Sequence, residues 1–216
     1  MKVSYTVQVC NESRELFSLL NFLVKMKDDE DDIIVVVDSL HTTDKVSRVT
    51  NHFKDRITVY ERPFDTFIKN AKFHIEKATG EYVFSIDADE MPQEALIKNF
   101  KKVITDTGAD VIWIPRINIH PGGTQEFFQK CKFHVNENGW INWPDYQGRI
   151  FKKNDSITWG YDETHPKLVG AEKNIQLQAN PQVALWHIKS IEKQDSRWVD
   201  GNINAPSTTD LYDLLM

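Results

Sequence analysis

The first 117 residues alternate between short apolar segments typical of β-strands and longer segments in which apolar residues recur at helical spacing. Val3–Val9 alternates and is rich in residues that favour strands, and residues 33–37 form a continuous apolar run typical of a strand buried on both faces. Between them, leucines recur at helical spacing over residues 13–26. Parallel neighbouring strands need a long connection of this kind, so the sequence predicts a βαβ unit.

The alternation continues to residue 117 and predicts an α/β fold with a mostly parallel central sheet flanked by helices. Pro92 is expected in the first turn of a helix that ends before Gly108. Beyond residue 118 the pattern changes to loops and isolated strands, from which we expect a small, mixed second sheet. The other expected strands are residues 57–60, 82–86, 111–114, 127–135, 147–152, 156–161 and 183–188, and the other expected helices are residues 45–53, 64–78 and 191–198.

Composition and charge exclude several classes of protein. The 216 residues are 40% hydrophobic and 27% charged, so neither a disordered nor a fibrous chain is indicated. The acidic run at 28–32, expected to be a solvated loop, accounts for five charges of the formal net charge of −6, and no basic stripe for nucleic acid is visible. No apolar run approaches the roughly 20 residues that span a membrane, and no secretory signal is evident, so we expect a cytoplasmic protein without membrane insertion.

Two carboxylates follow the predicted strand at 82–86. Asp87 and Asp89 are two positions apart, and in an extended segment such residues project to the same side. Hard cations such as Mg²⁺ and Mn²⁺ take oxygen ligands, and Mg²⁺ commonly combines one or two carboxylates with substrate phosphates and water. For an isolated Asp-x-Asp, acids that begin the next helix are the simpler interpretation. The position at the end of a buried strand favours a divalent metal site.

Several short motifs occur in order before residue 92. Asn11 and Glu12 follow the first predicted strand, and Asp38 ends the second. Lys69-Asn70 precedes the segment Ala-Thr-Gly-Glu-Tyr-Val at 78–83, which leads into the Asp-Ala-Asp segment. This order resembles the family 2 glycosyltransferases with the GT-A fold, and among them the lipopolysaccharide-core and phage-encoded enzymes. The later segment Trp-Pro-Asp-Tyr-Gln-Gly-Arg-Ile-Phe at 143–151 is similar to the same group.

The resemblance implies an enzyme that moves a sugar from a nucleoside-diphosphate sugar to a hydroxyl acceptor, with inversion at the anomeric carbon and with Mn²⁺ or Mg²⁺ as cofactor. It implies one GT-A domain at 1–203, with a nucleotide-binding half at 1–117 and an acceptor-binding half at 118–203, followed by a tail at 204–216. Asp89 would bind the metal directly, and His187, near the end of a late apolar strand, would be a second ligand unless it is a buried core histidine. The residues implied for the nucleotide sugar are Asn11, Glu12, Asp38, Lys69 and Asp87. For each of the first four, a capping, turn or solvated position is the simpler alternative.

An inverting displacement needs a general base near the acceptor hydroxyl, and a carboxylate serves well. We expect this base to be Asp145 or Glu163, in preference to His165. Pro166 stands where family members often have a Glu, so the two acids share the prediction.

The acceptor is expected to be a glycan or a lipid-linked glycan, bound in a groove of aromatic side chains unless these residues belong to the core. Hydroxylated bases in DNA are the alternative acceptor, if scattered lysines form a patch in the fold. Nucleotidyl transfer is a weaker hypothesis because no Gly-rich loop follows the first strand, and a non-catalytic carbohydrate-binding module is weaker because the carboxylate pair is intact. The aromatic residues are Trp140, Trp143, Tyr146, Trp159 and Tyr161, and the lysines are Lys98, Lys101, Lys102, Lys130, Lys132, Lys152 and Lys153.

Overall fold

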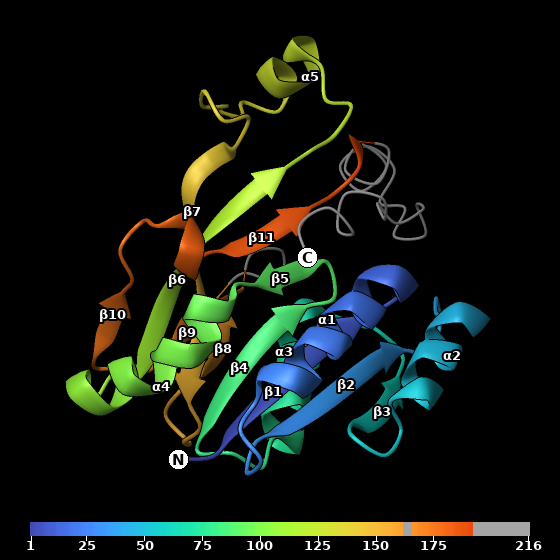
Figure 1. The fold of residues 1–216 in the computed structure, drawn as a ribbon, viewed down its shortest axis with the longest axis vertical. Helices are drawn as coiled ribbons and strands as arrows, with labels where there is room; N and C mark the ends of the chain where they lie inside the picture. Colours follow the sequence, from blue (N-terminus) through green and yellow to red (C-terminus); the bar gives the residue numbers. More distant parts are fainter. Residues whose placement is uncertain (162–165, 192–216) are drawn as a thin grey trace.

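The fold comes from a computed structural model that describes residues 1–161 and 166–191 (Figure 1). Glu163, His165, the expected tail at 204–216 and nearly all of the expected helix at 191–198 lie outside these residues. Predictions about them stay predictions.

The first half consists of the alternating strands and helices that the sequence predicts, with bounds that differ by a few residues. Its elements are β1 (Val3–Val9), α1 (Ser13–Met26), β2 (Asp32–Asp38), α2 (Asp44–His52), β3 (Thr58–Arg62), α3 (Phe67–Lys77) and β4 (Tyr82–Asp87). The prediction for Pro92 was wrong, because this residue ends a short strand, β5 (Glu90–Pro92), and α4 (Glu94–Thr107) begins after it. Gly108 ends α4 in the left-handed conformation with φ 64°, which glycine adopts without steric cost.

The second half contributes strands to the same sheet. The expected strand at 127–135 was wrong: α5 (Gln125–Lys130) occupies this region, and the side chain of Thr124 caps it by accepting a hydrogen bond from the Phe127 amide at 3.2 Å. The remaining elements are β6 (Val111–Ile119), β7 (Ile141–Lys152), β8 (Thr158–Tyr161), β9 (Pro166–Val169), β10 (Asn174–Gln176), a 3₁₀ turn (Pro181–Val183) and β11 (Leu185–Ile188).

The described strands form one large sheet and one small one. The nine-stranded sheet has the order β3-β2-β1-β4-β7-β6-β11-β5, with β10 beside β6. β1 to β4 are parallel and β11 is parallel to β6, whereas β7 and β5 run antiparallel to their neighbours. β8 and β9 form a separate antiparallel pair. The predicted class, a large and mostly parallel sheet with a small second sheet, is confirmed.

Hydrophobic side chains cover both faces of the central strands. Val35 and its alternate neighbours pack with α1 and α4 on one face, whereas Ile34 and Val36 pack on the other face with residues of α3 and β8. Because successive side chains of a strand point to opposite faces, a continuous apolar run fills both layers. Four leucines of α1 are completely buried in the first layer: Leu16, Leu19, Leu20 and Leu23.

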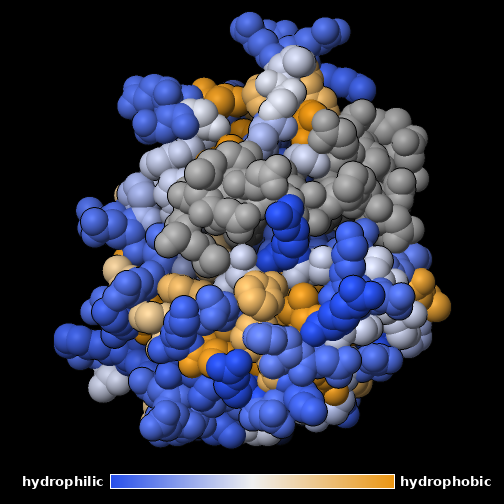
Figure 2. All heavy atoms as spheres, turned by 45° about the vertical axis from the view of Figure 1, so that its right-hand side comes forward, coloured by the Kyte–Doolittle hydropathy of each residue, from blue (hydrophilic) through white to orange (hydrophobic). Residues whose placement is uncertain are grey.

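The surface carries mostly polar side chains. On the face shown in Figure 2, hydrophilic residues dominate and hydrophobic ones form small groups between them. The exposed large hydrophobic side chains among the described residues lie in separate parts of the chain: Phe17, Leu40, Phe67 and Val135. Within the described ranges, none of the helices has both the length and the apolar character needed to cross a membrane.

Candidate active site

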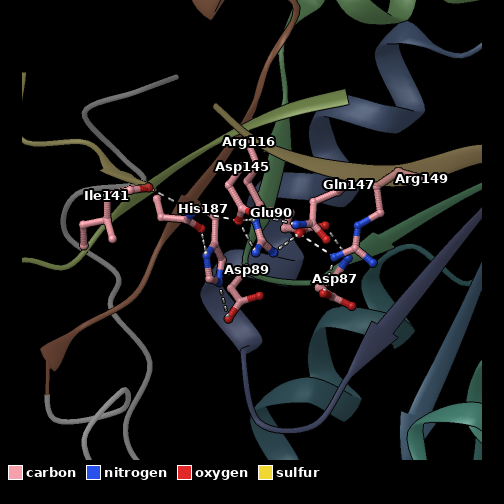
Figure 3. A network of polar contacts seen from close by, with 10 residues as sticks. Asp87, Asp89, Glu90, Arg116, Ile141, Asp145, Gln147, Arg149 and His187 are labelled. Atoms are coloured by element: carbon pink, nitrogen blue, oxygen red, sulfur yellow. Dashed lines mark hydrogen bonds and ion pairs between the residues drawn. The ribbon is translucent and has the colours of Figure 1, made fainter. Parts of the chain in front are cut away.

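Polar side chains from four parts of the fold meet at the carboxyl end of β4 (Figure 3). The turn from β4 to β5 carries Asp87, Asp89 and Glu90, and β11 carries His187. β11 lies between β5 and β6, so that His187 is opposite Glu90 on one side and Asn118 on the other. Through this pairing the second half of the chain completes a site begun by the first half.

Two largely buried arginines, with 18% and 11% of their side chains exposed, hold the central carboxylate of this cluster. Glu90 has no exposed surface, and its Oε1 accepts hydrogen bonds from Arg116 Nη1 at 2.9 Å and from Arg149 Nη2 at 2.5 Å. Arg149 Nη2 also donates to Asp87 Oδ2 at 2.6 Å. Burial would lower the pKa of Arg149, but Asp87 and Glu90 raise it further above its ordinary value. Both arginines are therefore permanent charges that neutralise the acids around them.

Asp87 is stabilised in its ionised form. Burial and the nearby Asp89 raise the pKa of this carboxyl, but the charge and hydrogen bond of Arg149, together with the charge of Arg116, outweigh them and lower it. Asp87 is thus an acceptor for Arg149 rather than an unpaired acid beside Asp89.

Asp145 lies on β7 and is held from two sides. Its Oδ2 accepts hydrogen bonds from Arg116 Nη2 at 2.6 Å, Arg116 Nε at 3.0 Å and Asn118 Nδ2 at 2.9 Å, and its Oδ1 accepts one from Gln147 Nε2 at 2.9 Å. Burial alone would raise the pKa of Asp145, but Arg116 and the hydrogen bonds hold it below its ordinary value. A carboxylate stabilised in this way is a weak proton acceptor, which favours a positioning role for Asp145.

Asp89 and His187 face each other beside this network. His187 Nε2 lies 3.6 Å from Asp89 Oδ2, and His187 Nδ1 lies 2.8 Å from Asn118 Oδ1. Both side chains are largely buried, with 11% of Asp89 and 13% of His187 exposed. In the part of the chain that the structure describes, no three His, Cys, Asp or Glu side chains form a complete metal site. A cation bound by this pair would therefore take its other ligands from substrate and water.

Three of the residues predicted for the nucleotide sugar lie at the ends of the neighbouring strands β1 and β2. Asp38 Oδ1 accepts hydrogen bonds from the amides of Leu40 and Phe64, both at 3.1 Å, and Asp38 Oδ2 lies 2.7 Å from His41 Nδ1. Asp38 thereby joins the loops that follow β2 and β3.

Asn11 and Glu12 follow β1. Glu12 Oε2 accepts hydrogen bonds from the amides of Cys10 at 2.9 Å and Asn11 at 3.0 Å, so the Glu12 side chain shapes the loop that leads into α1.

Lys69 lies in the first turn of α3, and its side chain is on the surface. Its side chain is 66% exposed and its Nζ lies 3.5 Å from Asp65, also on the surface. The next residue, Asn70, is buried instead and donates a hydrogen bond to Gln8 Oε1 of β1 at 2.6 Å. In the described conformation Asn70, not Lys69, faces the sheet.

The described aromatic side chains of the second half fall into separate packing groups, and the Tyr161 side chain lies outside the described part. Trp140 packs edge to face against Trp143 and Trp186, with ring centroids 5.1 Å and 6.0 Å apart. Trp159 packs against Phe151 in the core layer on the α3 face. The first group stays a candidate acceptor surface, whereas Trp159 is partly buried and packs against the core.

Sequence reasoning assigned no role to five polar residues of this site. Four of them alternate with Asp145 or with each other along a strand, a pattern that places side chains on one face and could have revealed them. The five residues are Glu90, Arg116, Asn118, Gln147 and Arg149.

His74, on α3, provides a test of burial near the site. It is 3% exposed, and burial lowers its pKa to about 4, against a smaller opposite effect of Asp87. Because the unfolded chain binds this proton first as the pH falls below about 6.5, the folded state loses stability towards pH 4. When the pH falls from 7 to 5, the free energy of unfolding should decrease in both proteins. We expect the decrease to be about 2 kcal/mol smaller in His74→Gln than in the unmodified protein. Urea denaturation at both pH values measures this difference, and equal losses would contradict the buried neutral histidine.

One protein family and several known proteins are similar to this chain. Residues 4–165 match the family described as Glycosyl transferase family 2. The SPbeta prophage-derived glycosyltransferase SunS of Bacillus subtilis (strain 168) is 32% identical over 136 residues, which are 58% of this chain and 31% of SunS. The chain therefore spans about a third of the length of this relative.

Solved structures with a similar fold include S. aureus TarS. The crystal structure of TarS has a TM-score of 0.61 at 18% identity, over 92% of this chain and 38% of TarS. The structure of TarS 1-349 in complex with UDP-GlcNAc has a TM-score of 0.60 at 18% identity, over 88% of this chain and 59% of that one. This likeness confirms the predicted GT-A fold.

Proposed function

Because the chain belongs to glycosyl transferase family 2, we propose that it transfers a sugar from a nucleoside-diphosphate donor to a hydroxyl acceptor, with inversion at the anomeric carbon. The observation that carries this proposal is the pair Asp89 and His187, which face each other at 3.6 Å at the end of β4. The carboxyl ends of parallel strands are where α/β sheets bind their ligands.

The donor set of this pair suits a divalent cation such as Mn²⁺ or Mg²⁺. A carboxylate oxygen is a preferred ligand of both ions, and an imidazole nitrogen suits Mn²⁺ better than Mg²⁺. When bound, the ion would neutralise the negative charge that develops on the leaving diphosphate. Asp89 and His187 would hold it, while Arg149 keeps the neighbouring Asp87 paired.

The chain's own residues would place the donor and accept the proton. The loops organised by Glu12 and Asp38, together with Asn11, would contact the nucleoside, and Asp87 would lie near the ribose. The acceptor hydroxyl would attack the anomeric carbon as the bond to the diphosphate breaks. A general base would take the hydroxyl proton.

Two substitutions separate the candidate bases. We expect Glu163→Gln to lower kcat at least about 100-fold, since a positioned base contributes a factor of this order. Asp145→Asn should act mainly on stability and lower the free energy of unfolding by about 2 kcal/mol, because the amide cannot accept all four hydrogen bonds of the carboxylate. Steady-state kinetics and urea denaturation of both variants measure this. A loss of no more than a few-fold activity in both would exclude the pair as base.

A glycan or lipid-linked glycan is the proposed acceptor class, in preference to DNA. Lys152 pairs with Tyr82 at the amino end of β4, away from Asp87. Three of the other lysines are paired with acids of the same chain: Lys98 with Glu94, Lys101 with Asp28 and Asp31, and Lys102 with Asp106. These lysines give no support to a phosphate-binding patch at the site.

A ligand screen tests the donor class. We expect nucleoside diphosphates with Mn²⁺ to raise Tm by about 5 to 10 °C at a ligand concentration of 100 Kd. UDP, GDP, ADP, CDP and UDP-GlcNAc are compared with and without Mn²⁺ and after chelation. If no nucleotide changes Tm under any of these conditions, the proposed donor is wrong.

A further inference from the structure

Asn118 connects Asp145 to His187 through the two ends of its amide. Its Nδ2 lies 2.9 Å from Asp145 Oδ2 and 3.4 Å from the carbonyl oxygen of Ile141, and its Oδ1 lies 2.8 Å from His187 Nδ1. Asn118 is 7% exposed, so water does not replace these partners.

The orientation of this amide follows from the chemistry of its neighbours. A carbonyl oxygen and an ionised carboxylate only accept hydrogen bonds, and Arg116 keeps Asp145 ionised. The group that faces them must therefore be the NH₂ of Asn118. Its oxygen then faces the ring of His187.

The same logic determines which ring nitrogen of His187 carries the proton. An amide oxygen only accepts, so at 2.8 Å the His187 Nδ1 must be the donor. In the neutral ring, Nε2 then has a free lone pair. This nitrogen is the one that faces Asp89 at 3.6 Å.

We propose that Asn118 is a positioning residue that holds His187 in the Nδ1–H tautomer and thereby presents Nε2, with Asp89, to a divalent cation. The proposal deepens the function proposed above and rests on it for the identity of the site. Hydrogen bonds of this kind fix the ring orientation and the tautomer of histidine ligands in proteins, and their loss typically weakens metal binding 10- to 100-fold.

The protein offers a matched control for this role. Gln147 donates to the other oxygen of Asp145 at the same distance of 2.9 Å as Asn118, but the described contacts of Gln147 do not include His187. Asn118→Leu and Gln147→Leu each remove one hydrogen bond from Asp145. Of the two, Asn118→Leu also removes the acceptor from His187.

The test reads the tautomer directly. Long-range ¹H–¹⁵N NMR of the metal-free, ¹⁵N-labelled protein distinguishes protonated from unprotonated ring nitrogens, and the spectrum of His187→Gln identifies the His187 signals among the seven histidines. Titration with MnCl₂, followed by electron paramagnetic resonance of the free ion, gives the Mn²⁺ affinity of each variant in the presence of UDP.

We expect protonated Nδ1 and unprotonated Nε2 in the unmodified protein and in Gln147→Leu. Asn118→Leu should lose this single tautomer and bind Mn²⁺ at least about 10-fold more weakly. An Nε2–H tautomer in the unmodified protein, or an unchanged tautomer in Asn118→Leu, would overturn the role of Asn118. The tautomer of the unmodified protein is measured without any variant, so that outcome does not depend on whether a variant folds. Failure of the unmodified protein to bind Mn²⁺ while the Nδ1–H tautomer is present would instead refute the proposed metal site.

Discussion

Asp89→Asn is expected to lower the rate of sugar transfer about 1000-fold without unfolding the protein. An amide oxygen binds a hard cation more weakly than a carboxylate does, and the negative charge that develops on the departing diphosphate is then poorly stabilised. Such stabilisation is commonly worth several kcal/mol, and about 4 kcal/mol corresponds to this factor. In the absence of metal the substitution should leave stability unchanged or slightly raised, because Asp89 and Asp87 repel each other.

Two measurements separate this expectation from a general structural defect. Transfer or donor hydrolysis is followed at saturating Mn²⁺, and Tm is measured with and without Mn²⁺ and a nucleoside diphosphate. Asp106→Asn, at an exposed position in the last turn of α4, removes a carboxylate that is paired with Lys102 and is the control. An Asp89→Asn variant that keeps the full metal-dependent rise in Tm and near-normal turnover would contradict the placement of the metal.

Glu90→Gln is expected to be the most destabilising conservative substitution in the site. Glu90 is completely buried and accepts hydrogen bonds from two partly exposed guanidinium groups, those of Arg116 and Arg149. The amide has nearly the same shape but no charge, and it leaves the positive charge of the pair only partly compensated. Breaking a buried ion pair from one side typically costs about 3 to 5 kcal/mol, so we expect a loss of this size in the free energy of unfolding.

The neighbouring helix supplies the control for Glu90. Glu94 begins α4, and its side chain is 60% exposed and paired with Lys98. Glu94→Gln should change the free energy of unfolding by less than about 0.5 kcal/mol, since exposed ion pairs contribute little. The free energies of unfolding of both variants are measured by urea denaturation. Similar small effects at both positions would show that Glu90 does not stabilise the buried network of charges.

The fold of the first half could be predicted because local pattern and tertiary environment agree there. The leucines of α1 and the apolar run in β2 are buried where their spacing places them. Pro92 and residues 127–135 were misassigned for a different reason. β5 exists because β11, almost 100 residues later, pairs with it, and no local pattern reports such a partner. At 127–135, apolar spacing in so short a segment does not distinguish a helical turn from a strand.

The site was predictable in part. Asp89 and His187 were named from the sequence and lie together in the fold. Their role as metal ligands stays a prediction. No role was assigned to Glu90 and Arg149 from the sequence, because a charged residue read alone is more often solvated than buried. Their burial depends on pairing between β5, β7 and their neighbours, which brings opposite charges together from distant positions in the chain.

The position of the metal is the central claim, and anomalous diffraction tests it most directly. Crystals of the protein grown with MnCl₂ and UDP are measured at a wavelength where Mn²⁺ scatters anomalously. We expect a single strong peak between the Asp89 carboxylate and His187 Nε2, next to the diphosphate of the bound nucleotide. A bound nucleotide without a peak at this pair, or with the peak at another group of side chains, would contradict the account.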